Sequence, residues 1–474
     1  NCICMNRRNF LHQLGVFSGG LALAASSLTK RAEAFSESGN LAEFKAGGYG
    51  ELIPTAAKNT GETYLALPKG FEYKVFGKVK NVMSDGNPTP AAHDGMATFK
   101  VKNELRLIRN HEVTGGRIPK PNAAIGANPY DEGAGGGTTT LIINPKTHEL
   151  IRDFVSLSGT LINCAGGPTP WGSWISCEET TLGATVFTPK GATKERGGFS
   201  KPHGYCFEVS ASANSAVNPE PLIAMGRFVH EAIAVDKKSG AVYLTEDNNP
   251  AGFYRFLPKR NKRLAEGGVL QVLKIKNADN FDTRKGQKTG ASFTANWVTI
   301  DNPNPESADT DEIAVFKQGE AKGAAIFTRL EGIYAGEKGK IYFDSTDGGE
   351  TKGGQIWLYE PTSKDEGRLT LMFESPSREI LYMPDNVCLR PNSNHLFICE
   401  DSDYQQTIGK IENYLRILTP DGRIADFAKN ITPKMESSEF AGSTFSKDGK
   451  TLFFNLQTVG ATFAVWGDWD KFKS

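Results

Sequence analysis

The sequence predicts an all-β protein, and within that class a six-bladed β-propeller. Three observations lead to this prediction. A strand–turn–strand pattern recurs six times along the chain, the 51 glycines and 24 prolines indicate many turns, and no notable amphipathic helix accompanies the strands. A hairpin that repeats in this way is typical of propeller blades.

The second strand of each hairpin is a short apolar run that ends in acidic or amide residues. These runs are 105–108, 174–176, 242–244, 341–343, 396–398 and 452–454. The first strand of most hairpins opens with an acidic residue followed by small or apolar ones, at Asp94, Glu231, Glu331, Asp385 and Glu439. Because the innermost strand of a blade lines the central channel, we expect these acids to point inward.

The repeats are unevenly spaced, so residues 181–198 and 258–327 are expected to be insertions between blades. Residues 65–76 could add a strand that closes the ring. The expected domains are an N-terminal segment at 35–84 and the propeller at 85–474. An eight-bladed propeller or a barrel is the alternative.

Composition excludes several classes of protein. The 54 Lys and Arg balance the 54 Asp and Glu, which argues against a globally basic nucleic-acid-binding protein. No uncharged apolar run is long enough for a membrane helix. We therefore expect a monomer that binds no nucleic acid and is not stably inserted in a membrane.

The first 34 residues are expected to be an export signal, with Met5 as the start and residues 1–4 untranslated. Arg7 and Arg8 precede Phe10 and Leu11, a glycine- and alanine-rich apolar stretch follows, and residues 32–34 form a small-x-small cleavage site. This order resembles a twin-arginine signal. It predicts the twin-arginine export machinery as a partner and a periplasmic or secreted protein.

Five cysteines remain after the expected start, an odd number that leaves at least one thiol outside any disulfide. Cys388 and Cys399 lie in consecutive predicted strands and could pair or could be two buried free thiols. No Cys/His spacing typical of zinc appears.

Carboxylates converging on one axis would repel one another unless cations neutralise them. Asp, Glu and Asn oxygens are the ligands that hard cations such as calcium prefer. The sequence therefore predicts a metal cluster in the channel, held by Glu112, Glu178, Glu231, Glu331, Asp385, Asn386 and Glu439.

Cys177 and Arg329 add two other kinds of chemistry. A thiolate beside carboxylates is expected only when a metal holds it deprotonated, and sulfur with oxygen suggests a transition metal such as iron. Arg329 lies two residues before Glu331 on one strand and is expected to share its face. Its guanidinium suits a phosphate substrate.

Two histidines are weaker candidates. His230 precedes Glu231, so strand alternation places it away from the channel, in a supporting or core position. His203 lies in a turn-rich segment and could reach the channel mouth, although a position away from it is favoured.

Several segments together are specific enough to indicate a family. The most specific is Thr169-Pro-Trp-Gly-Ser-Trp-Ile-Ser-Cys-Glu-Glu, with Asn163-Cys-Ala-Gly-Gly before it. The others are Lys201-Pro-His-Gly-Tyr, Gly226-Arg-Phe-Val-His-Glu, Tyr243-Leu-Thr-Glu-Asp and Arg329-Leu-Glu-Gly. With these segments the chain resembles the PhoX-type alkaline phosphatases of bacteria, and the resemblance extends over most of its length.

This resemblance implies a six-bladed propeller with iron and calcium ions joined by a bridging oxygen in the channel. It implies hydrolysis of small phosphomonoesters at alkaline pH, in phosphate acquisition. Cys177 would bind iron, Glu231 and neighbouring carboxylates would complete the metal shell, and Arg329 would bind the substrate phosphate. Glu331 and the remaining acids would hold calcium, and we assign Arg329 and Glu331 as the catalytic residues.

Two alternatives remain from the sequence. A calcium-dependent lactonase or esterase of the six-bladed type also uses channel acids around a cation, but needs neither Cys177 nor Arg329. A non-catalytic exported propeller would bind calcium or a partner without turnover.

Overall fold

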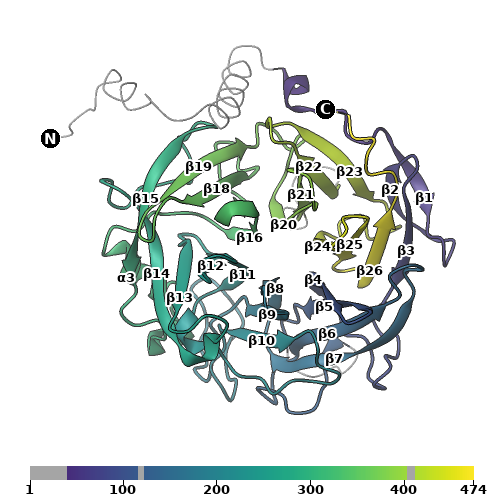
Figure 1. The fold of residues 1–474 in the computed structure, drawn as a ribbon. Coiled ribbons are helices and arrows are strands. Elements are labelled where there is room, and N and C mark those ends of the chain that lie inside the picture. The colour runs from purple at the N-terminus through teal and green to yellow at the C-terminus, as the bar shows by residue number, and fades with distance from the viewer. Residues whose placement is uncertain (1–39, 116–121, 403–411, 474) are drawn as a thin grey trace.

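A computed structural model describes residues 40–115, 122–402 and 412–473. The predicted export signal at 1–34 lies outside these residues. The described chain is almost entirely β-structure, arranged around a central axis (Figure 1). The predicted all-β propeller class is confirmed.

The strands form five hydrogen-bonded sheets. The first contains β4 (His93–Val101), β5 (Glu104–His111), β6 (Gly136–Ile143) and β7 (Leu150–Thr160). The second contains β8 (Asn163–Pro168), β9 (Ser173–Glu178) and β10 (Cys206–Ser210). All neighbouring strands within both sheets are antiparallel, as expected for chains of hairpins.

The third sheet has nine strands because one strand joins two four-stranded groups. The first group is β11 (His230–Val235), β12 (Val242–Glu246), β13 (Tyr254–Pro258) and β14 (Gly268–Ile275). The second is β16 (Leu330–Ala335), β17 (Ile341–Ser345), β18 (Gln355–Pro361) and β19 (Gly367–Glu374). Between them β15 (Ser292–Thr299) pairs with both β14 and β19.

The last two sheets include strands from the beginning of the described chain. One contains β1 (Leu52–Ala56), β2 (Thr63–Pro68), β20 (Pro384–Leu389), β21 (Leu396–Glu400), β22 (Tyr414–Leu418) and β23 (Ile424–Asn430). The other contains β3 (Glu72–Phe76), β24 (Phe440–Phe445), β25 (Thr451–Leu456) and β26 (Ala461–Trp466). Pairing of β3 with β26 joins the two ends of the chain.

Helices are few and short in the described residues. The α-helix is α3 (Ala314–Glu320), and the 3₁₀ turns are η2 (Leu41–Phe44), η4 (Ile223–Met225), η5 (Leu264–Glu266), η6 (Glu306–Asp309) and η7 (Glu337–Gly339). No helix among the described residues is long and apolar enough to cross a membrane.

The inner strands of the sheets are β4, β8, β11, β16, β20 and β24, and each contacts the next, with β24 returning to β4 (Figure 1). This closed ring surrounds the axis toward which the candidate acids were expected to point. The number of blades remains a prediction, because the hydrogen-bonded sheets do not separate into six.

The segment 258–327 differs from its expected role as an insertion. It supplies β14 and β15, because its apolar residues Leu270, Val272 and Leu273 are buried within the sheet. By contrast, residues 181–198 contain only an isolated bridge between Phe187 and Arg196.

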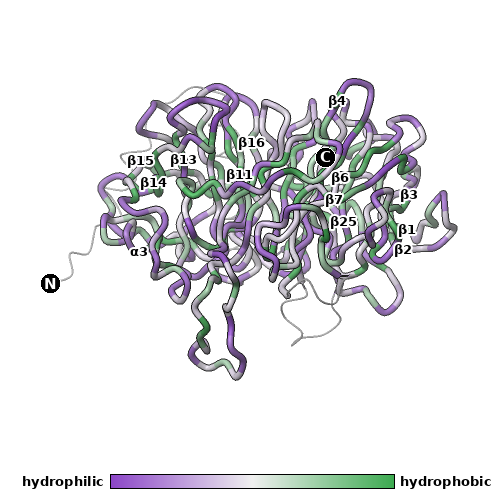
Figure 2. The backbone as a smooth tube through the Cα atoms, turned by 90° about the horizontal axis from the view of Figure 1, so that it is seen from below, coloured by the Kyte–Doolittle hydropathy of each residue, from purple (hydrophilic) through white to green (hydrophobic). Residues whose placement is uncertain are grey.

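The hydrophobic core is divided among several clusters around the ring and does not form one central cluster. One large cluster packs Phe71, Tyr73 and Val75 from β3 and the turn before it against β25 and β26. Another packs Trp357 and Tyr359 of β18 against Phe253 and Phe343. In the side view, hydrophilic residues concentrate in the loops at the two faces, and hydrophobic residues in the strands between them (Figure 2).

Candidate metal centre and phosphate site

The same irregularity occurs near the start of all six inner strands. The register with the next strand shifts at a β-bulge, between His93 and Met96 in β4 and at the equivalent places in β8, β11, β16, β20 and β24. A bulge leaves residues unpaired and re-aims their side chains. In five strands the first bulged residue can bind a metal: Asp94, Cys164, Glu231, Glu331 and Asp385.

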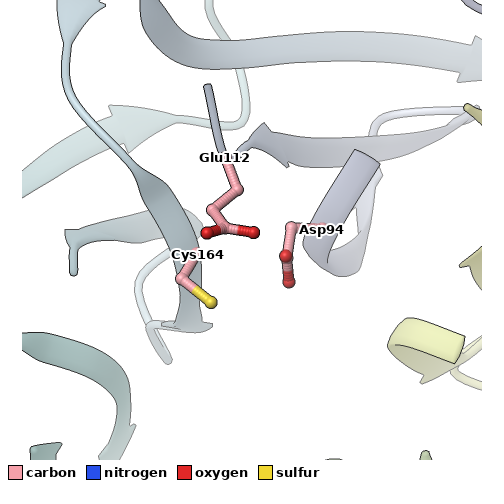
Figure 3. A group of neighbouring side chains, drawn as sticks. All are labelled: Asp94, Glu112 and Cys164. Carbon is pink, nitrogen blue, oxygen red and sulfur yellow. The ribbon is translucent and has the colours of Figure 1, made fainter. Parts of the chain in front are cut away.

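Two overlapping groups of these side chains are close enough to hold cations. In the first, one ligand atom each from Asp94, Glu112 and Cys164 lie within 4.8 Å of one another, and the three side chains point toward each other (Figure 3). In the second, Cys164 meets Glu179 and Glu231 within the same limit. Cys164 therefore lies at the junction of both groups.

Glu112 and Glu179 come from equivalent positions. Each directly follows the second strand of its hairpin, β5 or β9, so the outgoing strand adds a carboxylate beside the bulged residue of the inner strand. Asp247 after β12 and Asp401 after β21 occupy the same position in two further hairpins. These four hairpins can thus each offer two ligands, one from the bulge and one directly after the second strand.

Burial and mutual repulsion make these groups reluctant to ionise. Burial raises the pKa of Asp94 to about 7, with Asp401 adding to the effect. Burial also raises the pKa of Glu112, Glu179 and Glu231 well above the ordinary value, and neighbouring carboxylates raise each further. The pKa of the Cys164 thiol is raised for the same two reasons. A cation is the partner that would favour all of the charged forms together.

Buried carboxylate oxygens that lack hydrogen-bond partners also indicate a bound cation. Asp94 Oδ1 and Glu231 Oε1 are buried and make no hydrogen bond within the described residues. Buried polar atoms normally have a partner, and carboxylate oxygens with a thiolate form a mixed donor set suited to hard cations beside a transition metal. The residues present therefore fit a bound metal centre.

Arg329 and Glu331 lie at the start of β16. Arg329 donates from Nε to Asp247 Oδ1 at 2.9 Å, from Nη2 to Asp247 Oδ2 at 3.1 Å, and from Nη2 to Glu331 Oε1 at 2.6 Å. Burial alone would lower the pKa of Arg329, but the charges of Glu331 and Asp247 raise it above its ordinary value. The guanidinium is therefore a fixed positive charge beside the carboxylates.

Asp385, Asn386 and Glu439 come from the inner strands β20 and β24 or the residue before them. Asn386 Nδ2 donates to Asp385 Oδ1 at 2.7 Å, and Asn386 Oδ1 accepts from the backbone N–H of Gly442. Burial raises the pKa of Asp385 well above its ordinary value, and the charges of Glu331, Glu231, Asp94 and Glu439 add to this. These residues therefore share one electrostatic environment with the candidate ligands.

Comparisons with known proteins identify the family of the chain. The family model described as Alkaline phosphatase PhoX matches residues 48–460. The chain belongs to this family. Its PhoX-type propeller is similar to that of Pseudomonas fluorescens PhoX, solved in complex with vanadate, a transition state analogue. The TM-score is 0.64 at 19% identity, covering 89% of this chain and 98% of that one.

The PhoX-family chain also shows weaker similarity to XC5397 from Xanthomonas campestris, a gluconolactonase. That comparison has a TM-score of 0.41 and 10% identity, and covers 88% of this chain and 98% of the other. No curated protein matches the chain. The family match confirms the predicted family and supports an alkaline phosphatase that acts on phosphomonoesters.

Within the PhoX-type channel, Glu178 is not brought together with the candidate ligands. Its Oε1 accepts from the N–H of Leu161 at 2.9 Å and lies 2.6 Å from His203 Nδ1. Its Oε2 accepts from the N–H groups of Gly204 and Tyr205 at 2.8 and 3.1 Å. Both oxygens are satisfied by the protein, so Glu178 holds the 203–205 segment against β9 and leaves Glu179 to face the channel.

The structure also places Cys177 away from both candidate metal groups. Its sulfur lies 3.6 Å from Cys206 Sγ, in a hydrophobic cluster with Ile175 and Leu222. His230 is buried beside this cluster, with Nδ1 at 3.6 Å from Cys206 Sγ. The structure therefore does not support Cys177 as a ligand, and the thiol in the channel is that of Cys164. The five cysteines of the described residues are all free, including the buried Cys388 and Cys399.

The sequence analysis did not name Asp94, Cys164 and Glu179 as candidate ligands, although the structure places them in the groups that could hold a metal ion. Asp94 had been recognised as the opening of a hairpin, and Cys164 had been noted only within a matching segment. A signal was present, because Cys164-Ala, Asp94-Gly, Glu231-Ala and Glu331-Gly all place a potential ligand before a small residue. The small residue lets neighbouring inner strands approach closely: a Cβ on Gly95 would lie 2.5 Å from Ala165 Cα.

Proposed function

We propose that this alkaline phosphatase hydrolyses phosphomonoesters at a metal centre held by the bulged residues of its inner strands. The observation that carries the proposal is the meeting of Asp94, Glu112, Glu179 and Glu231 around Cys164. When bound, the cations would polarise the phosphate oxygens and offset charge developing in the transition state.

The donor atoms suggest which residues would hold iron and which would hold calcium. Cys164, with Glu179 and Glu231, supplies the softest donor set and would hold iron. The oxygen donors outside that set, Asp94, Glu112, Glu331, Asp385, Asn386 and Glu439, would hold calcium. The raised pKa values of the carboxyl groups indicate that cation binding displaces protons from them.

Arg329 is proposed as the residue that binds the substrate phosphate. Its two contacts with Asp247 fix the plane of the guanidinium, and its contact with Glu331 places it beside the carboxylate cluster. A guanidinium held in this way presents its positive charge to a phosphate in a fixed orientation, without first losing conformational freedom. Vanadate bound by the Pseudomonas fluorescens relative supports a site designed for phosphoryl transfer.

We also propose export through the twin-arginine route to the periplasm or beyond, as the arginine pair at 7–8 and the apolar stretch after it suggest. This route carries folded proteins, which agrees with a metal centre assembled before export. The substrates would then be small phosphomonoesters outside the cytoplasm.

Hydrolysis of p-nitrophenyl phosphate at alkaline pH tests the activity directly. The protein is supplied with iron and calcium, and is assayed before and after treatment with a strong chelator. We expect turnover that the chelator abolishes and that metal restores. A gluconolactone assay runs in parallel, and lactone hydrolysis without phosphatase turnover would overturn the proposal in favour of a lactonase.

A further inference from the structure

The channel continues beyond the candidate metal ligands as a cavity of about 660 Å³. It is formed by the second halves of the inner strands, after their bulges, and its apolar lining includes Met96, Phe99, Ile333, Val387 and Phe445. This volume lies within the usual range for pockets that bind small molecules.

The lining of this cavity has the opposite charge to the metal site. It includes Lys100, Lys237 and Lys447, and no carboxylate among the described residues. The three lysines are exposed and belong to three different hairpins, at or after the ends of β4, β11 and β24. Around this end of the channel they form a positive rim.

No described carboxylate forms an ion pair with these lysines. The nearest acids along the chain are already engaged in their own turns. Asp236 accepts from the N–H groups of Lys238 and Ser239, and Asp448 accepts from Ser446 Oγ and the N–H of Lys450. These contacts hold the two carboxylates in their turns and not in ion pairs with the rim lysines, so the three ammonium groups can contact a ligand, although Asp236 and Asp448 keep negative charges nearby.

Asn386 lies between the two ends of the channel. It donates to Asp385 on the side of the carboxylates, and it also lines the cavity. Each end therefore suits a different ligand: cations at the carboxylates, and an anion at the lysines. An apolar wall next to a cationic rim matches a molecule with an anionic head and an apolar chain.

We propose that this cavity binds a single-chain anionic amphiphile, with its head at Lys100, Lys237 and Lys447 and its chain along Met96, Phe99, Ile333 and Val387. The ligand is distinct from the phosphomonoester substrate, because the lysine end of the cavity contains none of the candidate metal ligands. Binding requires both parts of the molecule, the charge for the rim and the chain for the wall.

Calorimetric titration of delipidated full-length protein with laurate tests this inference. Laurate carries a carboxylate and no phosphoester, so its binding is independent of phosphatase turnover. The variant replaces all three lysines by alanine. A matched control replaces Lys69, Lys146 and Lys285, which are exposed elsewhere on the surface.

We expect one laurate site per molecule, with affinity about tenfold weaker in the Lys100→Ala, Lys237→Ala, Lys447→Ala variant and unchanged in the control. Inorganic phosphate and the uncharged dodecyl maltoside should not bind at this site. Absence of laurate binding would overturn the inference, as would equal affinity in the two triple variants or equal binding of the uncharged amphiphile. Phosphatase activity of both variants should equal that of the unaltered protein, which separates this test from that of the proposed function.

Discussion

At the scale of single residues, the sulfur of Cys164 is the atom on which the proposed metal centre depends most. It belongs to both candidate metal groups, and each group loses its only sulfur donor without it. The sequence analysis predicted Cys177 as the thiolate ligand, since it precedes two glutamates. Strand position separates them, because Cys164 is at a bulge and Cys177 is paired with Cys206 inside the sheet.

Arg329 gives a first prediction. Replacement by lysine keeps the charge but removes the planar fork that binds Asp247 at two atoms. We expect kcat/KM for p-nitrophenyl phosphate to fall about 100-fold or more, with metal content unchanged. Steady-state kinetics and elemental analysis of the same sample check this, and normal kinetics would exclude Arg329 from phosphate binding.

The carboxyl groups give a second prediction, on pH. The folded-state pKa of Asp94 is raised to about 7, against an ordinary value of 3.8, so the folded protein holds this proton over a range in which the unfolded chain has lost it. Its contribution to stability is complete below pH 4 and is lost as the pH rises toward 7. Metal-free protein should therefore melt at a lower temperature at pH 8 than at pH 5.

Bound metal should remove this decrease in melting temperature between pH 5 and pH 8, because cations bind the ionised carboxylates. Calorimetric melting curves of chelated and metal-loaded protein at both pH values provide the measurement. The Asp94→Asn variant is the matched control, and its metal-free form should lose less stability over the same range. A chelated protein as stable at pH 8 as at pH 5 would contradict the account.

At the scale of elements, the repeated bulge explains both what could and what could not be predicted. Alternating apolar residues and turn residues such as those at 237–240 identify hairpins directly, so the strands and the inward acids were predictable. A bulge depends on the partner strand, and local sequence does not reveal it. For this reason the sequence analysis predicted that Glu178 faces the channel. In the structure the next residue, Glu179, lies in a candidate metal group, and Glu178 accepts hydrogen bonds from the backbone.

Close approach of the inner strands gives a third prediction. A Cβ on Gly332 would lie 2.2 Å from the carbonyl oxygen of Asp385 on the neighbouring strand. Gly332→Ala should therefore destabilise the protein by about 2 kcal/mol, because the backbone at the bulge must move. Urea denaturation measures this. Gly115→Ala, where a Cβ meets nothing within 4 Å, should be nearly neutral.

At the scale of the whole molecule, the ring is held closed where β3 pairs with β26. Tyr73 of β3 is fully buried, and its hydroxyl accepts from the N–H of Tyr64 at 3.0 Å and donates to the carbonyl of Thr55 at 3.0 Å. This one side chain therefore connects the closing strand with β1 and β2. The pairing joins sequence positions nearly four hundred residues apart, and local pattern could only suggest it.

Removing this contact gives a fourth prediction. Tyr73→Ala should cost about 3 kcal/mol or more of unfolding free energy, since it leaves a cavity in the core that closes the ring. Tyr73→Phe is the matched control, and should lose only the part due to the hydrogen bonds, about 1 kcal/mol. Denaturation curves for the two variants distinguish packing from hydrogen bonding, and a neutral Tyr73→Ala would show that closure lies elsewhere.

We infer that the metal centre for phosphomonoester hydrolysis is assembled around Cys164. The most direct test compares bound metal and p-nitrophenyl phosphate turnover in Cys164→Ser and Cys177→Ser, purified together with the unaltered protein. The account predicts that Cys164→Ser loses transition metal and nearly all activity, while Cys177→Ser keeps both. Full metal content and activity in Cys164→Ser, or their loss in a folded Cys177→Ser alone, would contradict it.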